Sequence, residues 1–163
     1  VLGDEPKGLY IPDETARQIK QRLLPLADLA TPNAFELSWL TERPVSALHE
    51  AKTAVQGLGT KMVLATSVPA VGDRLATLLH DAAGTVFTSV ARRPKVPSGT
   101  GDLLAGLFTG ALASGRDARP ALAYAGARLE AVLGGTGLAD DLNLAILFEP
   151  EPELTHLTIE VAT

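Results

Sequence analysis

The sequence predicts an α/β fold, and three observations point to that class. Helical and strand-like patterns alternate through residues 13–65. Two further strand-like runs then lead into a glycine loop that opens a helix. The composition is that of one globular domain, because 46% of the 163 residues are hydrophobic and 20% are charged. We therefore expect a single domain over residues 1–163.

The first helix is expected over residues 13–24, where apolar side chains recur at helical spacing. Asp13 stands at its start in a capping position, and a proline stops it. Residues 27–30 form a short apolar run that is typical of a buried strand. The chain then turns at Thr31-Pro32-Asn33 and enters a helix over residues 34–40.

The middle of the chain continues the alternation. A helix is expected over residues 46–58, and residues 62–65 are typical of a buried strand that carries two hydroxyl side chains at its C-terminal end. Residues 74–80 and 85–91 are typical of two strands, and the Gly-containing turn between them predicts a hairpin. Helix followed by strand is the order of elements that builds an α/β sheet.

The remaining elements are two helical patterns and two strand-like runs. The first of the helices is rich in small and apolar residues, as a core helix would be. In chain order the four elements cover residues 102–114, 117–133, 142–148 and 157–161. No repeat, low-complexity tract or clear domain boundary interrupts them.

Composition argues against several classes of partner. Nineteen acidic residues against fourteen Lys and Arg give a net charge of −5, without a basic cluster interleaved with aromatics, so no nucleic-acid partner is expected. The absence of cysteine excludes disulfides and thiolate chemistry and leaves the cytoplasm as the default compartment. The longest uncharged stretch, residues 103–115, is too short to span a bilayer, so no membrane partner is expected.

Gly99-Thr100-Gly101-Asp102 lies where a loop becomes a helix. Two glycines let backbone N–H groups approach a ligand closely, and the helix dipole favours negative charge there, so the pattern indicates an anion site. Asp102 adds a carboxylate that can cap the helix or accept a proton from a substrate hydroxyl. A capped helix after a glycine turn explains the four residues equally well. The spacing matches neither a P-loop, which needs Lys after the second Gly, nor a dinucleotide-binding loop.

Asn33 and Glu36 stand three residues apart at the start of a predicted helix, so both side chains project from one face. Their oxygens suit Mg²⁺, directly or through water. When the pair is considered alone, a capping arrangement with Asn33 as the N-cap is the favoured interpretation. Thr66 and Ser67 place hydroxyl groups at a strand end, where α/β sheets generally bind ligands, although such residues are common at any strand exit.

Five sequence blocks occur in the order seen in pyridoxal kinases. The blocks are Val1-Leu2-Gly3-Asp4, Leu24-Pro25-Leu26-Ala27-Asp28, Thr31-Pro32-Asn33-Ala34-Phe35-Glu36-Leu37, Thr66-Ser67 and Gly99-Thr100-Gly101-Asp102. The chain therefore resembles that family, within the ribokinase-like superfamily, over nearly its whole length. The resemblance implies a three-layer α/β/α sandwich.

The resemblance also implies a reaction. The γ-phosphoryl group of ATP would pass to the 5′-hydroxymethyl group of pyridoxal, pyridoxine or pyridoxamine. Asp102 matches the family's catalytic base, and the backbone amides of Gly99, Thr100 and Gly101 match its anion hole. These roles agree with phosphoryl transfer, in which positioning and charge neutralisation are the protein's main work.

Cofactor-binding residues follow from the same resemblance. Mg²⁺ and a monovalent cation, K⁺ or Na⁺, are implied, with ATP as co-substrate. The residues implied near the metal ions are Asp4, Thr31, Asn33, Glu36 and Thr66. Those implied near the nucleotide are Asp4, Tyr10, Asn33, Thr66, Ser67, Val96, Ser98, Thr100 and Gly101. Residues 92–98, stiffened by two prolines, would lie beside the adenine as part of a lid.

The beginning of the chain departs from the family pattern. Family members run for many residues before the block that starts here at Val1, and that region supplies the first strands and helices, the surroundings of the pyridine ring and much of the dimer contact. We therefore expect the chain to be the C-terminal, ATP- and Mg²⁺-binding portion of a kinase that is a homodimer when complete. The fragment alone is expected to be inactive and to expose sheet edges.

Two alternatives to a pyridoxal kinase remain open. Hydroxymethylpyrimidine kinase shares the glycine loop, but Phe35-Glu36-Leu37 after Thr-Pro-Asn fits pyridoxal kinases better. The other alternative is of a different class, a non-catalytic nucleotide-binding or interaction module derived from a kinase by truncation.

Overall fold

The computed structural model describes residues 1–136, 141–150 and 158–162, which fold into two compact units. The first unit contains Val1–Val90 and the C-terminal strand, and the second contains Ala91–Ile159. Helices and a sheet are mixed in the described chain, so the predicted α/β class is confirmed. No helix among the described residues is long and apolar enough to cross a membrane.

The first unit is built on a five-stranded sheet in the order β3-β4-β5-β6-β7. The β3 strand runs parallel to β4, whereas the β4–β5 and β6–β7 pairs are antiparallel. The predicted hairpin is present, and Gly84 at its turn has a φ of +111°, which favours glycine. The strands are β3 (Leu29–Ala30), β4 (Met62–Ala70), β5 (Arg74–Asp81), β6 (Gly84–Ala91) and β7 (Glu160–Val161).

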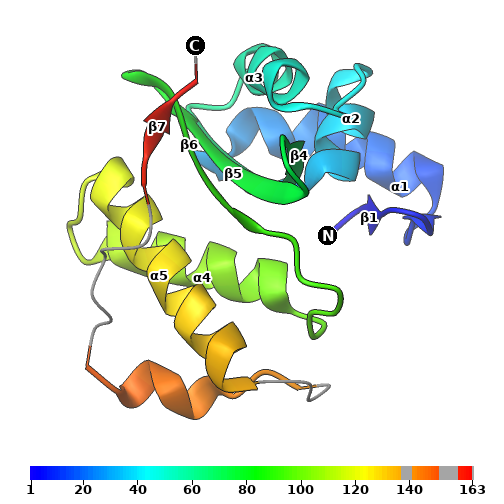
Figure 1. The fold of residues 1–163 in the computed structure, drawn as a ribbon. Coiled ribbons are helices and arrows are strands. Elements are labelled where there is room, and N and C mark those ends of the chain that lie inside the picture. Colours follow the sequence, from blue (N-terminus) through cyan, green and yellow to red (C-terminus); the bar gives the residue numbers. More distant parts are fainter. Residues whose placement is uncertain (137–140, 151–157, 163) are drawn as a thin grey trace. The chain divides into compact units, whose positions relative to one another are not determined.

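Two helices, α2 (Ala34–Thr41) and α3 (Leu48–Gly57), pack against β4 and β5 (Figure 1). Their buried side chains meet those of the two strands in one core. Its fully buried members include Leu37, Val55, Val63 and Leu78. The helix predicted over residues 46–58 begins at Leu48, because the backbone and hydroxyl of Ser46 both donate to Glu50 at 2.7 Å ahead of the helix.

The N-terminal helix differs from its prediction in two ways. The α-helical part, α1, covers only Asp13–Gln18, and the chain continues as a π-helical turn over Ile19–Leu23 and a 3₁₀ turn over Leu24–Leu26. Asp13 does not cap the helix, because Pro12 occupies the N-cap position. The Asp13 carboxylate lies in the first turn instead and pairs with Arg17 at 2.6 Å.

The β4 strand is longer than predicted. It runs on to Ala70, so Thr66 and Ser67 lie inside the strand and not at its end. Pairing with β5 shifts between Ala65 and Val68, which makes a bulge, and Ser67 in that bulge has a φ of +57°. A short antiparallel ribbon, β1 (Gly3–Asp4) and β2 (Gly8–Leu9), completes this unit.

The second unit contains two long helices packed against each other, α4 (Thr100–Ala113) and α5 (Ala118–Thr136) (Figure 1). The predicted strand over residues 142–148 is wrong. The chain there forms a 3₁₀ helix, η3 (Leu144–Phe148), whose start is capped by the Asn143 side chain accepting from the Ala145 N–H. Of the predicted strand over residues 157–161, Glu160 and Val161 form β7, and residue 157 lies outside the described residues.

Candidate functional site

The glycine loop forms the N-terminus of α4. Gly99 is the N-cap residue with a φ of +85°, and its carbonyl accepts the N–H of Leu103 at 2.9 Å. Because glycine has no side chain, it leaves the first backbone N–H groups of α4 uncapped. An ideal Cβ built on Gly101 would meet no atom within 4 Å, so this face of the helix start is open. The loop has the geometry of an anion site.

Asp102 lies in the first turn of α4, and its side chain is exposed. Gly99 holds the N-cap position, so Asp102 is not the N-cap residue, although a carboxylate in the first turn still interacts favourably with the helix dipole. The carboxylate borders an open groove along α4. The groove continues past two exposed glycines, Gly106 and Gly110, to Tyr124 of α5, over whose ring Arg116 stacks at 4.6 Å. Asp102 is therefore accessible to a ligand.

Sequence reasoning missed Arg116 and Tyr124. A weak signal for the groove exists, because Gly106 and Gly110 are four residues apart and mark one face of a helix as bare. Nothing in the sequence indicates which aromatic side chain lies beside that face.

The loop before Gly99, which belongs to the second unit, is held by two side-chain contacts. Arg93 pairs with Glu130 of α5 at 2.9 Å, and the Thr100 hydroxyl donates to the carbonyl of buried Pro97 at 2.7 Å. Val96 and Ser98, the two residues implied near the nucleotide, are both exposed between these points. Both side chains are thus open to solvent, while the two contacts fix the backbone on either side of them.

In the first unit, Asn33 and Glu36 form the capping box that the sequence predicts. The Asn33 side chain accepts the Glu36 N–H at 2.9 Å, and Glu36 accepts the Asn33 N–H at 3.0 Å. Both side chains also reach β1. Glu36 accepts the N–H groups of Leu2 and, at 3.3 Å, Gly3, and the Asn33 amide donates to the Gly3 carbonyl at 2.8 Å.

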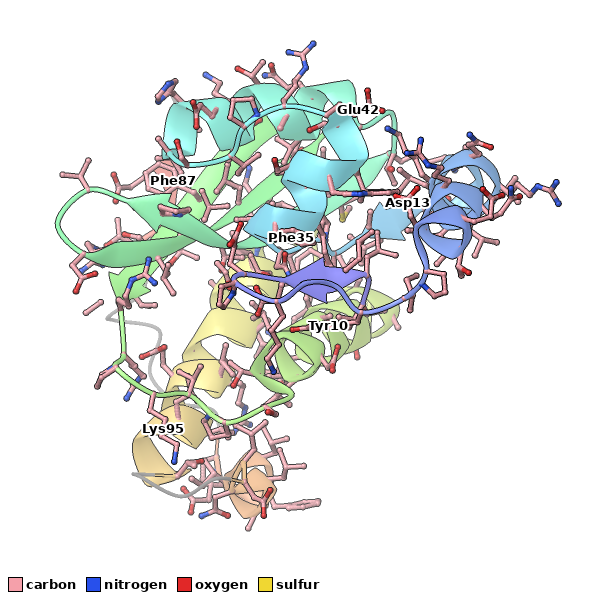
Figure 2. The ribbon with its side chains drawn as sticks, turned by 90° about the vertical axis from the view of Figure 1, so that its right-hand side faces the viewer. Tyr10, Asp13, Phe35, Glu42, Phe87 and Lys95 are labelled. Carbon is pink, nitrogen blue, oxygen red and sulfur yellow. The ribbon has the colours of Figure 1, made fainter. Side chains whose placement is uncertain are left out.

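The β1–β2 ribbon carries Asp4 and Tyr10. Asp4 is exposed, and its carboxylate accepts the N–H of Glu5 at 2.9 Å. Tyr10 is also exposed, while its backbone N–H donates to the Leu2 carbonyl at 2.8 Å. Figure 2 shows Phe35 of α2 beside this ribbon. An ideal Cβ on Gly3 would lie 2.6 Å from the Phe35 ring, so the close contact requires glycine.

The segment before α2 lies along β4. Asn33 and Thr66 pair as an isolated parallel β-bridge, and the Thr66 N–H donates to the Pro32 carbonyl at 2.9 Å. Thr66 is buried, whereas Thr31 and Ser67 are exposed. The structure therefore brings Asn33, Glu36, Thr66 and the backbone before Asp4 into one hydrogen-bonded region of the first unit.

The predicted site residues fall into two groups, one in each compact unit. The first unit holds Asp4, Tyr10, Thr31, Asn33, Glu36, Thr66 and Ser67. The second holds Val96, Ser98, Gly99, Thr100, Gly101 and Asp102.

The side chains of the described residues do not by themselves form a metal-binding site. Within the described ranges, no three His, Asp or Glu side chains gather closely enough to hold a metal ion. Both Glu36 oxygens already accept backbone N–H groups, and Asp4 is an exposed carboxylate. Such a set fits a Mg²⁺ ion that keeps waters and takes most of its other ligands from phosphates.

Comparison with known proteins identifies the family. A family model described as phosphomethylpyrimidine kinase matches residues 6–138. The chain belongs to this family. Within it, pyridoxal kinase PdxY of Corynebacterium diphtheriae is 32% identical over 162 residues, a match that covers 96% of this chain and 57% of that protein.

Solved pyridoxal kinases share the fold. The enzyme of Entamoeba histolytica superimposes with a TM-score of 0.84 at 27% identity, covering 98% of this chain and 59% of that one. The Leishmania donovani enzyme in complex with ADP and pyridoxine gives 0.80 at 27% identity, with 98% and 59% covered. The predicted resemblance to pyridoxal kinases of ribokinase-like fold is thus confirmed. The chain spans 57–59% of the length of these three relatives.

Proposed function

We propose that the protein containing this chain is an ATP-dependent kinase that phosphorylates the 5′-hydroxymethyl group of pyridoxal, and also of pyridoxine and pyridoxamine. The observation that carries the proposal is the start of α4, where a left-handed Gly99 leaves backbone N–H groups open and Asp102 follows within the first turn. The names of the relatives and the ADP and pyridoxine bound by the Leishmania enzyme support the choice of substrates.

Asp102 would act as the general base. The substrate hydroxyl oxygen attacks the γ-phosphorus, the bond from that phosphorus to the β,γ-bridging oxygen breaks, and ADP leaves. The hydroxyl proton passes to the Asp102 carboxylate late in this process, because the transition state is loose. The amides of Gly99, Thr100 and Gly101 would donate to the phosphoryl oxygens as negative charge spreads over them. Positioning is thus the main work of the loop.

ATP and its cations would bind through the residues that the resemblance implies. Bound Mg²⁺ would neutralise phosphate charge, with Asp4 as the exposed carboxylate available to it and with Asn33 and Glu36 acting through water or backbone. Thr31 and Thr66 would lie near a monovalent cation, K⁺ or Na⁺. Val96 and Ser98 would lie beside the adenine, with Tyr10, Ser67 and Thr66 also near the nucleotide.

We further propose that the two units are parts of one kinase domain, since the family model matches residues 6–138 across both. A homodimer in the cytoplasm is the proposed state of the complete protein. Light scattering of the full-length protein tests whether it is a homodimer, and cell fractionation tests whether it is cytoplasmic.

The deciding experiment measures phosphorylation of pyridoxal by the full-length protein with Mg-ATP. Asp102→Asn is expected to abolish turnover and to leave ATP affinity within about threefold, because the variant keeps the shape of the side chain and removes the base. Asp117→Asn, at an exposed carboxylate just before α5, is the matched control and retains activity. Undiminished turnover in Asp102→Asn would remove Asp102 from the mechanism.

The same assay separates the alternatives. Preference for hydroxymethylpyrimidine over pyridoxal would support a hydroxymethylpyrimidine kinase, which the names of the curated relatives favour less. ATP binding without turnover of either substrate would support a non-catalytic module.

A further inference from the structure

We propose that Glu36 is a positioning residue that sets the backbone in front of Asp4, and that it does not bind the metal ion itself. Glu36 is 6% exposed, and its carboxylate accepts three backbone N–H groups. Two of these belong to Leu2 and Gly3, more than thirty residues away in the sequence. We call these hydrogen bonds from Leu2 and Gly3 to Glu36 the clamp. The clamp is independent of the proposed function, and only the role given to Asp4 rests on that function.

Burial makes these contacts obligatory for the carboxylate. An ionised carboxylate removed from water must replace its hydration with hydrogen bonds, and charge-assisted bonds from N–H groups are the strong kind. Here one oxygen accepts Leu2 and Gly3 and the other accepts Asn33. Capping the helix needs only the Asn33 contact, so the other oxygen serves a different purpose, which is to hold β1.

The clamp has a second arm. The Asn33 side-chain amide donates to the Gly3 carbonyl at 2.8 Å, so the peptide groups on both sides of Gly3 are bound to the start of α2. The same start is joined to β4 by the bond from Thr66 N–H to the Pro32 carbonyl. Asp4 follows directly on Gly3, and its exposed side chain therefore projects from a backbone that is fixed on one side.

The proposal differs from direct ligation in what it requires before any metal is added. A clamp holds Leu2 and Gly3 in the metal-free protein, whereas a metal ligand leaves those amides unaffected until the ion binds. Amide hydrogen exchange of the wild-type full-length protein in EDTA, without nucleotide, reads this difference and involves no mutation. We expect both amides to be protected there. Protection that arises only after addition of Mg²⁺ would overturn the proposal.

Variants test the clamp through stability. Glu36→Gln keeps the size of the side chain but removes the charge and turns an NH₂ group toward N–H donors. In EDTA we expect a lower thermal midpoint and at least about tenfold faster exchange at Leu2 and Gly3. Asp4→Asn is the matched control, since its exposed carboxylate accepts only a neighbouring N–H, and both quantities stay unchanged. An unchanged midpoint and exchange rate in Glu36→Gln would refute the clamp.

A double-mutant cycle tests whether Glu36 acts through Asp4. We measure how strongly Mg²⁺ increases the affinity for a non-hydrolysable ATP analogue in wild type, Glu36→Gln, Asp4→Asn and the double variant. The expected outcome is that Glu36→Gln weakens the Mg²⁺ effect in wild type and adds nothing in the Asp4→Asn background. A further loss in the double variant would show that Glu36 meets the metal independently. Neither readout requires turnover, so failure of the proposed activity and failure of the clamp are distinguishable.

Discussion

The side chain of Ser67 stands beside Thr66 at a break in the β4–β5 ladder, and the two residues differ sharply in environment. Thr66 is buried and bridges to Asn33, whereas Ser67 is exposed and has a left-handed backbone with a φ of +57°. A bulge turns a side chain out of the regular alternation of a strand. The left-handed conformation costs a non-glycine residue about 1–2 kcal/mol. Such strain is typical of positions kept for a ligand contact.

Ser67→Gly is expected to stabilise the protein by up to about 1 kcal/mol, because glycine adopts a positive φ without the steric penalty and its larger chain entropy offsets part of the gain. Urea denaturation of the full-length protein measures the change. If the hydroxyl contacts ATP, as proposed, the same variant binds the nucleotide more weakly. A variant that is less stable than wild type would contradict the strained assignment.

Gly3→Ala is expected to destabilise the protein by at least about 2 kcal/mol. The new methyl group would overlap the Gly8 carbonyl oxygen and lie 2.6 Å from the Phe35 ring, and the first of these atoms is backbone that cannot rotate away. Gly57→Ala, near the end of α3, is the control, because an ideal Cβ there meets nothing within 4 Å. Equal midpoints for the two variants in thermal denaturation would show that the ribbon and α2 are not packed as described.

Gly101→Ala separates stability from binding at the helix start. The space around Gly101 is open, and alanine is a better helix former than glycine, so stability is expected to rise by about 0.5–1 kcal/mol. The methyl group would cover the amides proposed to bind phosphate, and turnover is expected to fall at least about tenfold. Gly134→Ala, at an open position of α5, should raise stability without loss of turnover. Full activity of Gly101→Ala would argue against the anion hole.

The hydrogen bonds of Glu50 at the start of α3 predict that stability depends on pH. The Ser46 hydroxyl and then its backbone N–H donate to the carboxylate and hold the pKa of Glu50 below its usual value. A folded-state pKa below the unfolded one contributes stability that is present above the unfolded pKa and is lost as pH falls through the folded pKa. In Ser46→Ala we expect the pKa of Glu50, followed by NMR titration, to move upward. A pKa unchanged by the substitution would contradict these contacts.

Local sequence signals predicted the parts of the fold that local chemistry decides. The capping box of Asn33 and Glu36 could be read from spacing, since both partners lie in one turn of helix. The glycine loop could be read because few other residues permit the φ of Gly99. The contacts from Glu36 to Leu2 and Gly3 could not, because nothing in the sequence indicates which distant backbone meets a buried carboxylate.

Two predictions were wrong, each for its own reason. The apolar run at residues 142–148 suits a strand and a short helix equally. The Asn143 side chain caps the start of the segment and so favours the 3₁₀ helix. The strand predicted over residues 62–65 continues to Ala70, because Thr66 and Ser67 form a bulge within it and not its exit. Bulges depend on the partner strand, whose register the sequence does not display.

The position of β7 determines when the sheet can be completed during synthesis. Its residues pair with Val86 and Phe87, yet they follow the whole second unit in the sequence. A ribosome therefore makes α4 and α5 while the outer side of β6 still lacks this partner. Open strand edges of that kind recruit other chains, so this edge of the nascent polypeptide is open to aggregation between the synthesis of β6 and that of residues 160–161.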